Sequence, residues 1–593
     1  MVEYRVMSNS SAVAQQIARC LVAAGVREVV LSPGSRSAPL VYAFAPLAEA
    51  GVLRTHVRLD ERDAGFLALG LARGLRVRAA ESGERGSPVA LVTTSGSAVA
   101  NLHPGVLEAS YGHLPLIAIT ADRPARLRGT GANQTIDDQA HVLSDVRARF
   151  DVPAGAAVTT DGVKGTVAEA VARSMGAAVD GASSPSLPGP VQLNVQFDTP
   201  LVPTTDELEA WTAEFAESAD ADPVREASAA APSDALSPSG SSAGGPTVDV
   251  TLTEGTVIVA GDAGGHSADS LRELAEERSL PVLAEPSSPL AFGAGASSTF
   301  VPAHARVLTD HPELAGAIRT VIVHGKPTLT RPVAALLADT SVSVRRVPDD
   351  IDAHVLTVTG ESPDDDGAWV RDWVEAGNAA VGAVRDEQSA RTARAITEHL
   401  AAQDITLFAA SSNTIRYLSG AVDVRARIHA SRGLAGIDGL VSTATGLSLG
   451  LAEPVVLLIG DIAMLHDVGG LLTPTSEETG SVTIVVLNDD GGAIFSGLEH
   501  SQPHVAPYLE RYFTVPHGRG FGELAAAYGW DHAQVSTLED FSAVFADTQA
   551  GSQSAGGHGE HGEHGEHGEH GEHSVRRTII EVDLTSPPTD HDA

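Results

Sequence analysis

The chain has 593 residues and is acidic, because 76 Asp and Glu against 39 Lys and Arg give a net charge of −37. Its only lysines are Lys164 and Lys326, so 37 arginines (39 − 2) carry the remaining positive charge. This balance excludes the broad basic surface that binds DNA or RNA. The length is too great for one core and predicts two to four domains.

The sequence also indicates where the protein is located and which cysteine-based links it can form. Cys20 is the single cysteine, which excludes an internal disulfide and a cysteine-based zinc site. No uninterrupted apolar run of about 18 residues occurs, and the first residues lack an export signal, so we expect a cytoplasmic protein without membrane insertion. The acid surplus suggests adaptation to high salt, which screens self-repulsion. An activity optimum at low ionic strength would contradict that hypothesis.

Helices and apolar strands alternate from the start of the chain. Residues 12–23 have apolar side chains at helical spacing and precede the apolar run 29–31. Further strands are predicted at 89–93 and 116–120, each followed by a polar turn. Such alternation predicts a parallel α/β sheet with its site at the carboxyl ends of the strands. We assign this first domain to residues 1–198.

A linker and a second α/β unit follow. Residues 199–250 include a long stretch rich in Ala, Ser, Pro, Gly and Asp, which predicts a linker or an exposed insertion. A central α/β domain is expected at 251–360, with strands at 256–260 and 320–324. The glycine turn at 261–265 lacks the spacing of a dinucleotide fingerprint, so we favour a structural turn there.

A third α/β domain is predicted at 361–593, which completes three consecutive α/β domains with parallel sheets. Its apolar strands lie at 454–459 and 482–487. Near its end, residues 551–574 contain a His-Gly-Glu repeat whose glycine at every third position prevents a stable helix. A disordered surface loop is the favoured interpretation, and transition-metal binding by its histidines is the alternative.

Carboxylates follow two apolar strands of the third domain. Gly460-Asp461 ends one strand, and Asp489 follows the next strand 28 residues later (489 − 461). Together with the backbone carbonyl of Gly491, these oxygens can converge on Mg²⁺ or Mn²⁺, with phosphate and water oxygens as the remaining ligands. The helix after Gly460 would point its first amides at those phosphates. The alternative is two ordinary strand ends whose acids cap helices.

This pattern resembles the metal and diphosphate signature of thiamine diphosphate (ThDP) enzymes. Such an enzyme also needs a glutamate that hydrogen-bonds the aminopyrimidine of the cofactor. Glu61, in Asp60-Glu61-Arg62 at the start of a predicted helix, is the candidate. It would do general acid–base work as a buried carboxyl. The plainer interpretation is an acid favoured by the helix dipole.

Six further motifs occur in the order of a single family. They are 31–40 (LSPGSRSAPL), 60–70 (DERDAGFLALG), 94–102 (TSGSAVANL), 120–124 (TADRP), 131–135 (GANQT) and 431–440 (SRGLAGIDGL). They resemble 2-succinyl-5-enolpyruvyl-6-hydroxy-3-cyclohexene-1-carboxylate (SEPHCHC) synthase, the ThDP-dependent transferase of menaquinone biosynthesis. The resemblance covers nearly the whole chain except about 216–250 and 551–574.

The resemblance implies a ThDP-enzyme architecture that uses ThDP with Mg²⁺ or Mn²⁺. It implies decarboxylation of 2-oxoglutarate and addition of the resulting succinyl carbanion to isochorismate. It also implies a homodimer or a dimer of dimers with cofactor sites between subunits. Two dicarboxylate substrates and a diphosphate explain the arginines, because guanidinium groups hold carboxylates bidentately and stay charged.

Site residues are carried over from the family motif by motif. The catalytic set is Ser35, Arg36, Glu61 and Gln134, and the substrate set is Arg123, Arg331, Ser412, Arg416, Arg432, Ile494, Phe495 and Leu498. The cofactor set is Glu61, Ile437, Gly460, Asp461, Ile462, Ala463 and Asp489, and the metal ligands are Asp461, Asp489 and Gly491. Two positions depart from the family: Asp489 stands where asparagine is usual, and Arg331 where lysine is usual.

Two other functions compete with this interpretation. Another ThDP enzyme, an oxo-acid decarboxylase or an acetolactate-type synthase, would share Glu61 and Asp461 but would not need the arginine set. A metal-handling protein would instead depend on the histidine-rich loop at 551–574. Turnover of pyruvate without isochorismate would favour the first, and loss of function on deleting the loop would favour the second.

Overall fold

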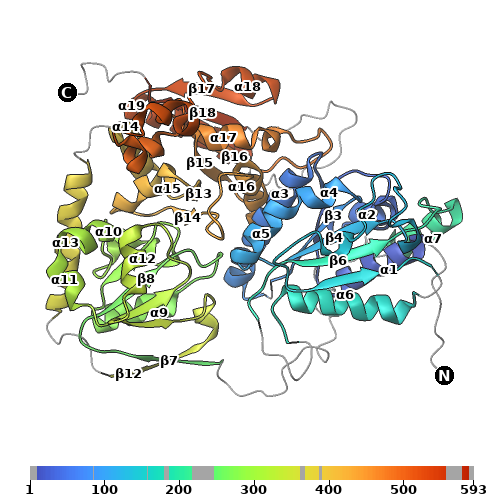
Figure 1. The fold of residues 1–593 in the computed structure, drawn as a ribbon, viewed down its shortest axis with the longest axis horizontal. Helices are drawn as coiled ribbons and strands as arrows, with labels where there is room; N and C mark the ends of the chain where they lie inside the picture. The colour runs from blue at the N-terminus through green and yellow to red at the C-terminus, as the bar shows by residue number, and fades with distance from the viewer. Residues whose placement is uncertain are drawn as a thin grey trace, which may run out of the picture. The chain divides into compact units, whose positions relative to one another are not determined.

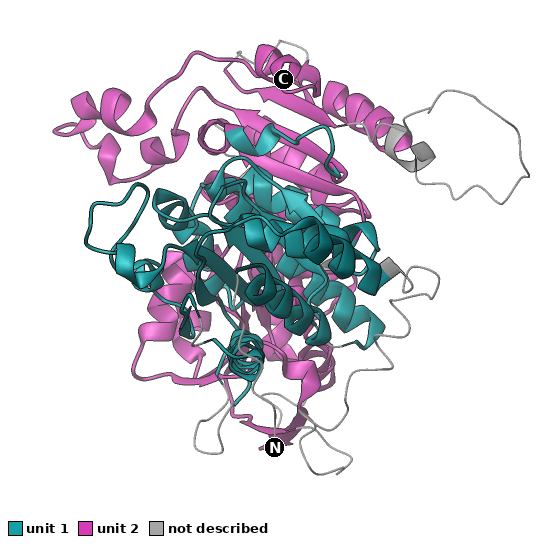
Figure 2. Cartoon of the chain, turned by 90° about the vertical axis from the view of Figure 1, so that its right-hand side faces the viewer, with its two compact units in different colours: residues 1–241, 433–451, 469–478 teal, residues 242–432, 452–468, 479–593 magenta. Residues whose placement is uncertain are grey.

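A computed structural model gives the fold of the chain. The structure describes residues 10–84, 86–155, 158–178, 186–216, 246–360, 367–385, 390–555 and 577–585. Two compact units are distinguished, as coloured in Figure 2. Unit 1 holds residues 1–241, 433–451 and 469–478, and unit 2 holds 242–432, 452–468 and 479–593.

The first sheet, in unit 1, has six parallel strands in the order β2-β1-β3-β4-β6-β5. The strands are β1 (Glu28–Leu31), β2 (Arg54–Val57), β3 (Val89–Thr93), β4 (Leu116–Asp122), β5 (Arg149–Val152) and β6 (Val191–Gln196). The chain leaves β1 toward β2 on one side and returns to β3 on the other. In open α/β sheets, such a reversal leaves a crevice at the carboxyl ends of the two strands between which it occurs, here β1 and β3.

Helices cover both faces of this sheet (Figure 1). One face packs against α1 (Ser10–Ala23), α2 (Ala38–Glu49), α6 (Thr160–Ser174) and α7 (Thr205–Ala216), and the other against α3 (Glu61–Ser82) and α5 (His103–Tyr111). Neighbouring strand residues alternate between the two cores: Val29 and Leu31 face the first, and Val30 faces the second. Burial on both faces explains why these strands are continuous apolar runs.

Helix α16 (Leu440–Leu451) also belongs to unit 1, where it packs closely against α3. Glycines permit this approach on both helices. A Cβ at Gly70 would overlap the carbonyl oxygen of Thr443, and one at Gly446 would overlap that of Leu67. The residues before α16 are held by the same contact, because a side chain at Gly439 would overlap the ring of Phe66.

The second sheet, in unit 2, has four parallel strands in the order β11-β10-β8-β9. They are β8 (Thr256–Ala260), β9 (Val282–Ala284), β10 (Thr320–His324) and β11 (Ser343–Arg346), while β7 (Thr247–Thr251) pairs with β12 (Val355–Thr359) separately. Helices α9 (Asp269–Arg278), α10 (His304–Asp310), α11 (Pro312–Ala317), α12 (Arg331–Ala338) and α13 (Ala368–Arg385) accompany them. The glycine turn after β8 is structural. The backbone of Asp262 forms an isolated β-bridge with Lys326, and its side chain accepts a hydrogen bond from the amide of Gly264.

The third sheet repeats the strand order of the first, as β14-β13-β15-β16-β18-β17. Its strands are β13 (Thr406–Ala409), β14 (Arg427–His429), β15 (Val455–Gly460), β16 (Val482–Asn488), β17 (Asp531–Val535) and β18 (Thr578–Asp583). The helices are α14 (Arg391–Ala401), α15 (Asn413–Tyr417), α17 (Asp461–His466), α18 (Gly522–Ala527) and α19 (Leu538–Ala555). Here the order reverses between β13 and β15.

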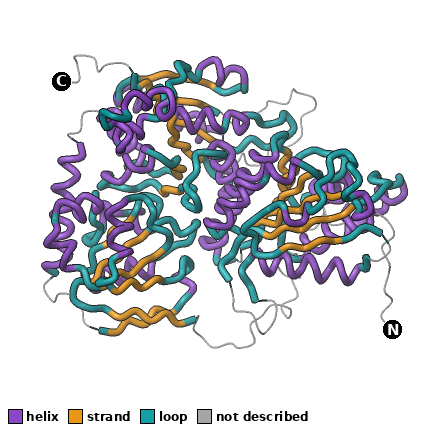
Figure 3. Tube along the Cα trace, in the orientation of Figure 1, coloured by secondary structure: helices purple, strands orange, loops and turns teal. Residues whose placement is uncertain are grey.

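The predicted fold class is confirmed: along the described residues, three parallel sheets of four or six strands follow one another, and helices (purple) and strands (orange) alternate in Figure 3. The predicted domain boundaries stay predictions. Most of the 199–250 linker and of the histidine-rich loop lies outside the described residues. Within the described residues, no helix is both long enough and apolar enough to span a membrane.

A matched pair of glycine substitutions tests the contact between α3 and α16. Gly446→Ala inserts a methyl group into the Leu67 carbonyl, so we expect the free energy of unfolding to fall by about 1–3 kcal/mol. Gly165→Ala is the control: Gly165 lies inside α6 with no atom within 4 Å of an added Cβ. There, better helix propensity should raise stability by up to about 1 kcal/mol. Equal effects in urea unfolding would contradict the close approach.

Candidate functional site

A buried carboxylate organises the carboxyl end of the third sheet. Asp461, 3% exposed, is the first residue of α17 and follows β15 directly. Its Oδ1 accepts the amide of Ile462 at 2.7 Å, and its Oδ2 accepts the amide of Gly491 at 2.7 Å. One side chain therefore joins the ends of β15 and β16, where the sequence predicts the metal ligands.

Asp489 lies close to Asp461 in the same part of unit 2. Burial, followed by the charge of Asp461, raises the pKa of Asp489 to about 7. Burial also raises the pKa of Asp461, against the hydrogen bonds that it accepts. Two neighbouring carboxylates that repel each other are hard oxygen donors that fit a divalent cation. Among the described residues, no group of three His, Cys, Asp or Glu side chains is placed to hold a metal.

Sequence reasoning missed His517, which belongs to this cluster. Its Nε2 lies 2.9 Å from Oδ2 of Asp461, and its backbone amide donates to Oδ1 of Asp490 at 3.1 Å. Asn488 is occupied elsewhere, because its Nδ2 donates to Glu581 at 2.7 Å. No spacing signal marks His517, which lies 56 residues after Asp461. The remaining predicted cofactor residues, Gly460, Ile462 and Ala463, are consecutive with Asp461 at the start of α17.

Arg416 and Arg432 come together with a buried acid. Partial burial and the charge of Arg432 lower the pKa of Arg416, while Glu285 acts in the opposite direction. Arg432 is 6% exposed and donates through Nη2 to Thr328 at 2.9 Å. Burial raises the pKa of Glu285 to about 7, against a hydrogen bond from the amide of Leu329 at 2.5 Å.

Ser412 lies near Arg416 because it is the N-cap residue of α15, which carries Arg416. Its φ of 75° is unusual for a residue other than glycine. The backbone oxygen of Ser412 accepts from Nη1 of Arg416 at 2.5 Å. The strained turn and this hydrogen bond fix the guanidinium close to the start of the helix.

Other predicted substrate residues also lie in unit 2. Arg331 begins α12, and its side chain is 82% exposed and pairs with Glu499 at 2.7 Å. Ile494, Phe495 and Leu498 are half-buried between 493 and 498. Phe495 lies against the aromatic ring of Phe513, with ring centroids 5.6 Å apart. The chain itself therefore supplies a carboxylate partner for Arg331.

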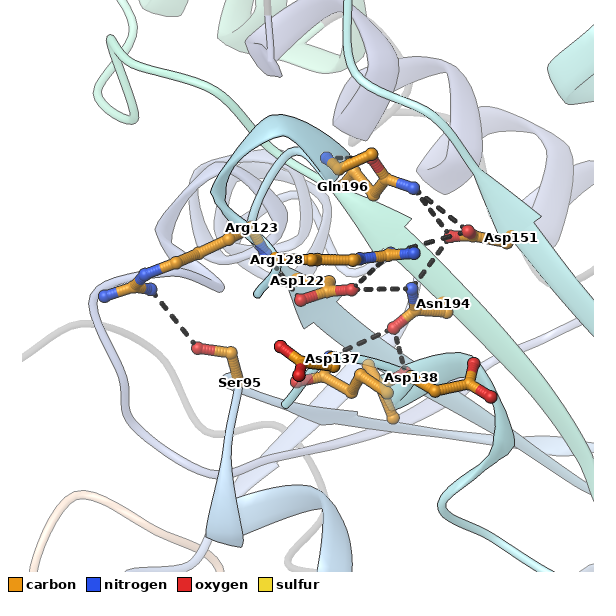
Figure 4. A network of polar contacts seen from close by, with 12 residues as sticks. Ser95, Asp122, Arg123, Arg128, Asp137, Asp138, Asp151, Asn194 and Gln196 are labelled. Carbon is orange, nitrogen blue, oxygen red and sulfur yellow. Dashed lines mark hydrogen bonds and ion pairs between the residues drawn. The ribbon is translucent and has the colours of Figure 1, made fainter. Parts of the chain in front are cut away.

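In unit 1, predicted residues gather at the carboxyl ends of β1, β3 and β4. Ser35 and Arg36 follow β1. Their turn packs against the turn after β3, because a Cβ at Gly34 would overlap Thr94. Arg123 follows β4 and reaches Oγ of Ser95 at 3.5 Å, as Figure 4 shows.

Two contacts extend this cluster. Burial and the nearby Arg123 lower the pKa of Arg36, so the two guanidinium groups share one region. Gln134, whose φ is 54°, donates through Nε2 to the Ser95 carbonyl at 2.9 Å. The structure therefore brings Arg36, Arg123 and Gln134 together around the turn after β3.

Glu61 begins α3, as predicted, after Asp60 caps the helix by accepting the amide of Arg62. Its Oε2 lies 3.4 Å from Nδ2 of Asn101. Ile437 also lies in unit 1, on the segment before α16. Glu108 holds that segment, because its two oxygens accept the amides of Gly433 at 2.7 Å and Leu434 at 2.6 Å.

Known proteins resemble this chain in sequence and in fold. Residues 11–142 match the thiamine pyrophosphate enzyme N-terminal TPP binding domain, and residues 413–555 match the C-terminal TPP binding domain. A SEPHCHC synthase from Paenarthrobacter aurescens (strain TC1) is 39% identical, covering 88% of this chain and 89% of the relative. The synthase from Kineococcus radiotolerans is 38% identical, covering 90% and 92%. Benzoylformate decarboxylase from Polynucleobacter necessarius has a similar fold, with a TM-score of 0.59, 15% identity and coverage of 98% and 100%.

The raised pKa of Asp489 predicts a pH-dependent stability of the metal-free chain. Since the unfolded side chain ionises near 3.8 and the folded one at about 7, the stabilising contribution is full below about pH 4 and is lost as the pH rises through about 7. Asp489→Asn cannot ionise, so its free energy of unfolding relative to wild type should rise across that window, on the order of a few kcal/mol.

Urea unfolding with a chelator at about pH 5 and about pH 8 measures this difference. Asp404→Asn, at an exposed position with Asp404 80% exposed, is the control. A difference between wild type and Asp489→Asn that does not change with pH would contradict the cause assigned to the shift.

Proposed function

We propose that this chain condenses 2-oxoglutarate with isochorismate. The proposal starts from its family, because the chain belongs to the SEPHCHC synthases and is a ThDP-dependent enzyme of menaquinone biosynthesis. The products are CO₂ and 2-succinyl-5-enolpyruvyl-6-hydroxy-3-cyclohexene-1-carboxylate. The observation that carries this choice of substrates is the grouping of arginines. In a chain of net charge −37, Arg36 lies near Arg123 and Arg416 near Arg432. Paired guanidinium groups suit substrates that bring several carboxylates to one place.

The residues divide the work by chemistry. ThDP, when bound, supplies the carbanion chemistry that decarboxylation and carbon–carbon bond formation need. Asp461, Asp489 and the carbonyl of Gly491 would hold Mg²⁺ or Mn²⁺, and the amides at the start of α17 would face the diphosphate. The carboxyl of Glu61 would hold the proton at the aminopyrimidine ring. Ile437 would support the cofactor from its apolar side.

Further side chains would hold the substrates. Ser35, Ser412 and Gln134 donate hydrogen bonds, and the arginine pairs bind carboxylates. Ile494, Phe495 and Leu498 would exclude water from the reacting carbons. Arg331 would contribute only after it exchanges Glu499 for a substrate carboxylate, so its role rests on the family resemblance alone.

Two alternatives make different predictions. An oxo-acid decarboxylase or an acetolactate-type synthase would turn over pyruvate without isochorismate. The fold shared with benzoylformate decarboxylase, at 15% identity, supports only the architecture. A metal-handling protein would lose its function when residues 556–573 are deleted, whereas the synthase should keep nearly unchanged turnover. Assembly as a homodimer or a dimer of dimers and a cytoplasmic location remain predictions, and a molar mass of 61.0 kDa in solution would contradict the first.

Glu61→Gln tests the proton-holding role. The amide keeps the shape of the side chain but cannot exchange the proton, so we expect kcat to fall by at least about 10²-fold. Isochorismate consumption is followed with 2-oxoglutarate, ThDP and Mg²⁺ at high salt. Glu81→Gln, near the other end of α3, is the control and should retain full activity. A Glu61→Gln enzyme with wild-type kcat would show that the assigned role is wrong.

Arg432→Lys tests the recognition of carboxylates. Lysine keeps the charge but cannot contact both Thr328 and a substrate in the planar fork of arginine. We expect KM for one dicarboxylate substrate to rise about tenfold, equivalent to about 1.4 kcal/mol, with kcat nearly unchanged. Arg425→Lys, on an exposed ion pair with Asp404, is the matched control. A fall in kcat with unchanged KM values would contradict a binding role.

A further inference from the structure

A layer of buried polar side chains lies beneath Arg123 and Gln134 in unit 1. Asp122, Gln139 and Asn194 are each 0% exposed. Asp122 ends β4, Asn194 lies in β6, and Gln139 begins the 3₁₀ turn η2 (Gln139–His141). Buried amides and carboxylates are costly unless they are hydrogen-bonded, so their partners are informative.

Asn194 uses its complete hydrogen-bonding capacity within this layer, much of which is drawn in Figure 4. Its Oδ1 accepts from Thr120 at 3.0 Å and from Gln139 at 3.0 Å. Its Nδ2 donates to Asp122 at 3.1 Å and to Asp151 at 2.8 Å. These four bonds allow a single orientation of the amide, so Asn194 offers Gln139 an acceptor in a fixed place.

Gln139 transmits that orientation to the turn after β3. Its Nε2 donates to Asn194 and to the backbone oxygen of Ala121 at 3.0 Å. Its Oε1 must then face the other way, where it accepts the amide of Gly96 at 3.0 Å. Gly96 has φ 82° and ψ −142°, a conformation that only glycine adopts readily.

The turn held by Gln139 is in contact with Gln134. Oγ of Ser95 donates to the backbone oxygen of Gln134 at 2.8 Å, and Nε2 of Gln134 donates to the backbone oxygen of Ser95 at 2.9 Å. A Cβ on Gly96 would lie 2.8 Å from Cγ of Gln134. Any displacement of the Ser95-Gly96 turn therefore displaces Gln134 and the contact from Arg123.

We propose that Gln139 is a positioning residue, which with Asn194 fixes the Ser95-Gly96 turn so that Gln134 and Arg123 meet the substrates in the productive orientation. The inference rests on the proposed function, because it assigns Gln134 to the reacting carbons. Gln139 acts through Gln134 and Arg123 and does not itself touch the substrates. Misplacement of such a group by about 1 Å can cost up to about 10²-fold in rate.

Gln139→Met tests this role, because methionine keeps the volume and removes the three side-chain hydrogen bonds. We expect kcat to fall about 10- to 100-fold, with little change in the affinity for ThDP. In a Gln134→Ala background, Gln139→Met should cause a clearly smaller further loss than in the wild type, since only its effect through Arg123 remains. Losses that multiply in the double variant would overturn the proposal.

Gln192→Met is the matched control. Gln192 is also 0% exposed in the same layer and donates to the backbone oxygen of Gln139 at 2.8 Å, but it has no bond to Gly96. We expect a similar fall in thermal stability with kcat nearly unchanged. An equal loss of kcat in both variants would overturn the proposal, because any lost buried amide would then have the same effect.

Hydrogen exchange of the ligand-free protein separates this proposal from the proposed function. Gln139→Met should raise the exchange rate of the Gly96 amide, and Gln192→Met should not. Failure of the wild type to consume isochorismate would remove the proposed function, while the exchange result would still report the link to the turn. An unchanged Gly96 exchange rate in Gln139→Met would overturn the positioning role itself.

Discussion

The reversal of strand order between two neighbouring parallel strands is the constraint on which both candidate sites depend. In the first sheet it lies between β1 and β3, and in the third between β13 and β15. Loops that leave such strands diverge to opposite sides and open a crevice at their carboxyl ends. Ser35 and Ser95 follow the first pair, and Ser412 and Asp461 follow the second. The two sheets have the same strand order. The loops after the corresponding strands carry residues with different predicted roles.

Each candidate site is next to a polar side chain that is almost completely buried. Asp461 ties the ends of β15 and β16 through backbone amides, and Asn194 with Asp122 ties β4, β5 and β6. Such groups are stable in an apolar interior only when their hydrogen bonds are satisfied. Because every hydrogen bond of these buried side chains must be satisfied, each side chain has a single orientation. A site that discriminates between small acids needs side chains that are fixed in this way.

Local sequence was sufficient to predict the strands and the residues that follow them. Apolar runs such as 89–93 and 482–487 are strands, and Glu61 opens its helix, because burial on both sheet faces and a capping aspartate leave clear patterns. Contacts between distant segments leave no such pattern. The bond from His517 to Asp461 and the bond from Gln139 to Gly96 join residues that are 56 and 43 positions apart. The helix contact at Gly446 was missed for the same reason, since its partner lies in the first domain.

The chain as a whole is acidic, whereas the predicted site residues include neighbouring arginines. In a chain with 76 acidic residues, Arg36 lies near Arg123 and Arg126, and Arg416 lies near Arg432. Glu499 already neutralises Arg331 on the surface, which distinguishes that position from Arg432 in the interior. Within each unit, two of the arginines predicted to act in the site therefore lie near each other.

Joining the two acids, and not merely decarboxylating one of them, distinguishes a SEPHCHC synthase from a simple decarboxylase. The most direct measurement supplies 2-oxoglutarate labelled with ¹³C in its C1 carboxyl group, with ThDP and Mg²⁺, and compares the release of labelled CO₂ with and without isochorismate. The carboligase account predicts release that depends on isochorismate and equals its consumption mole for mole. Equal release without isochorismate would contradict it and would favour a simple decarboxylase.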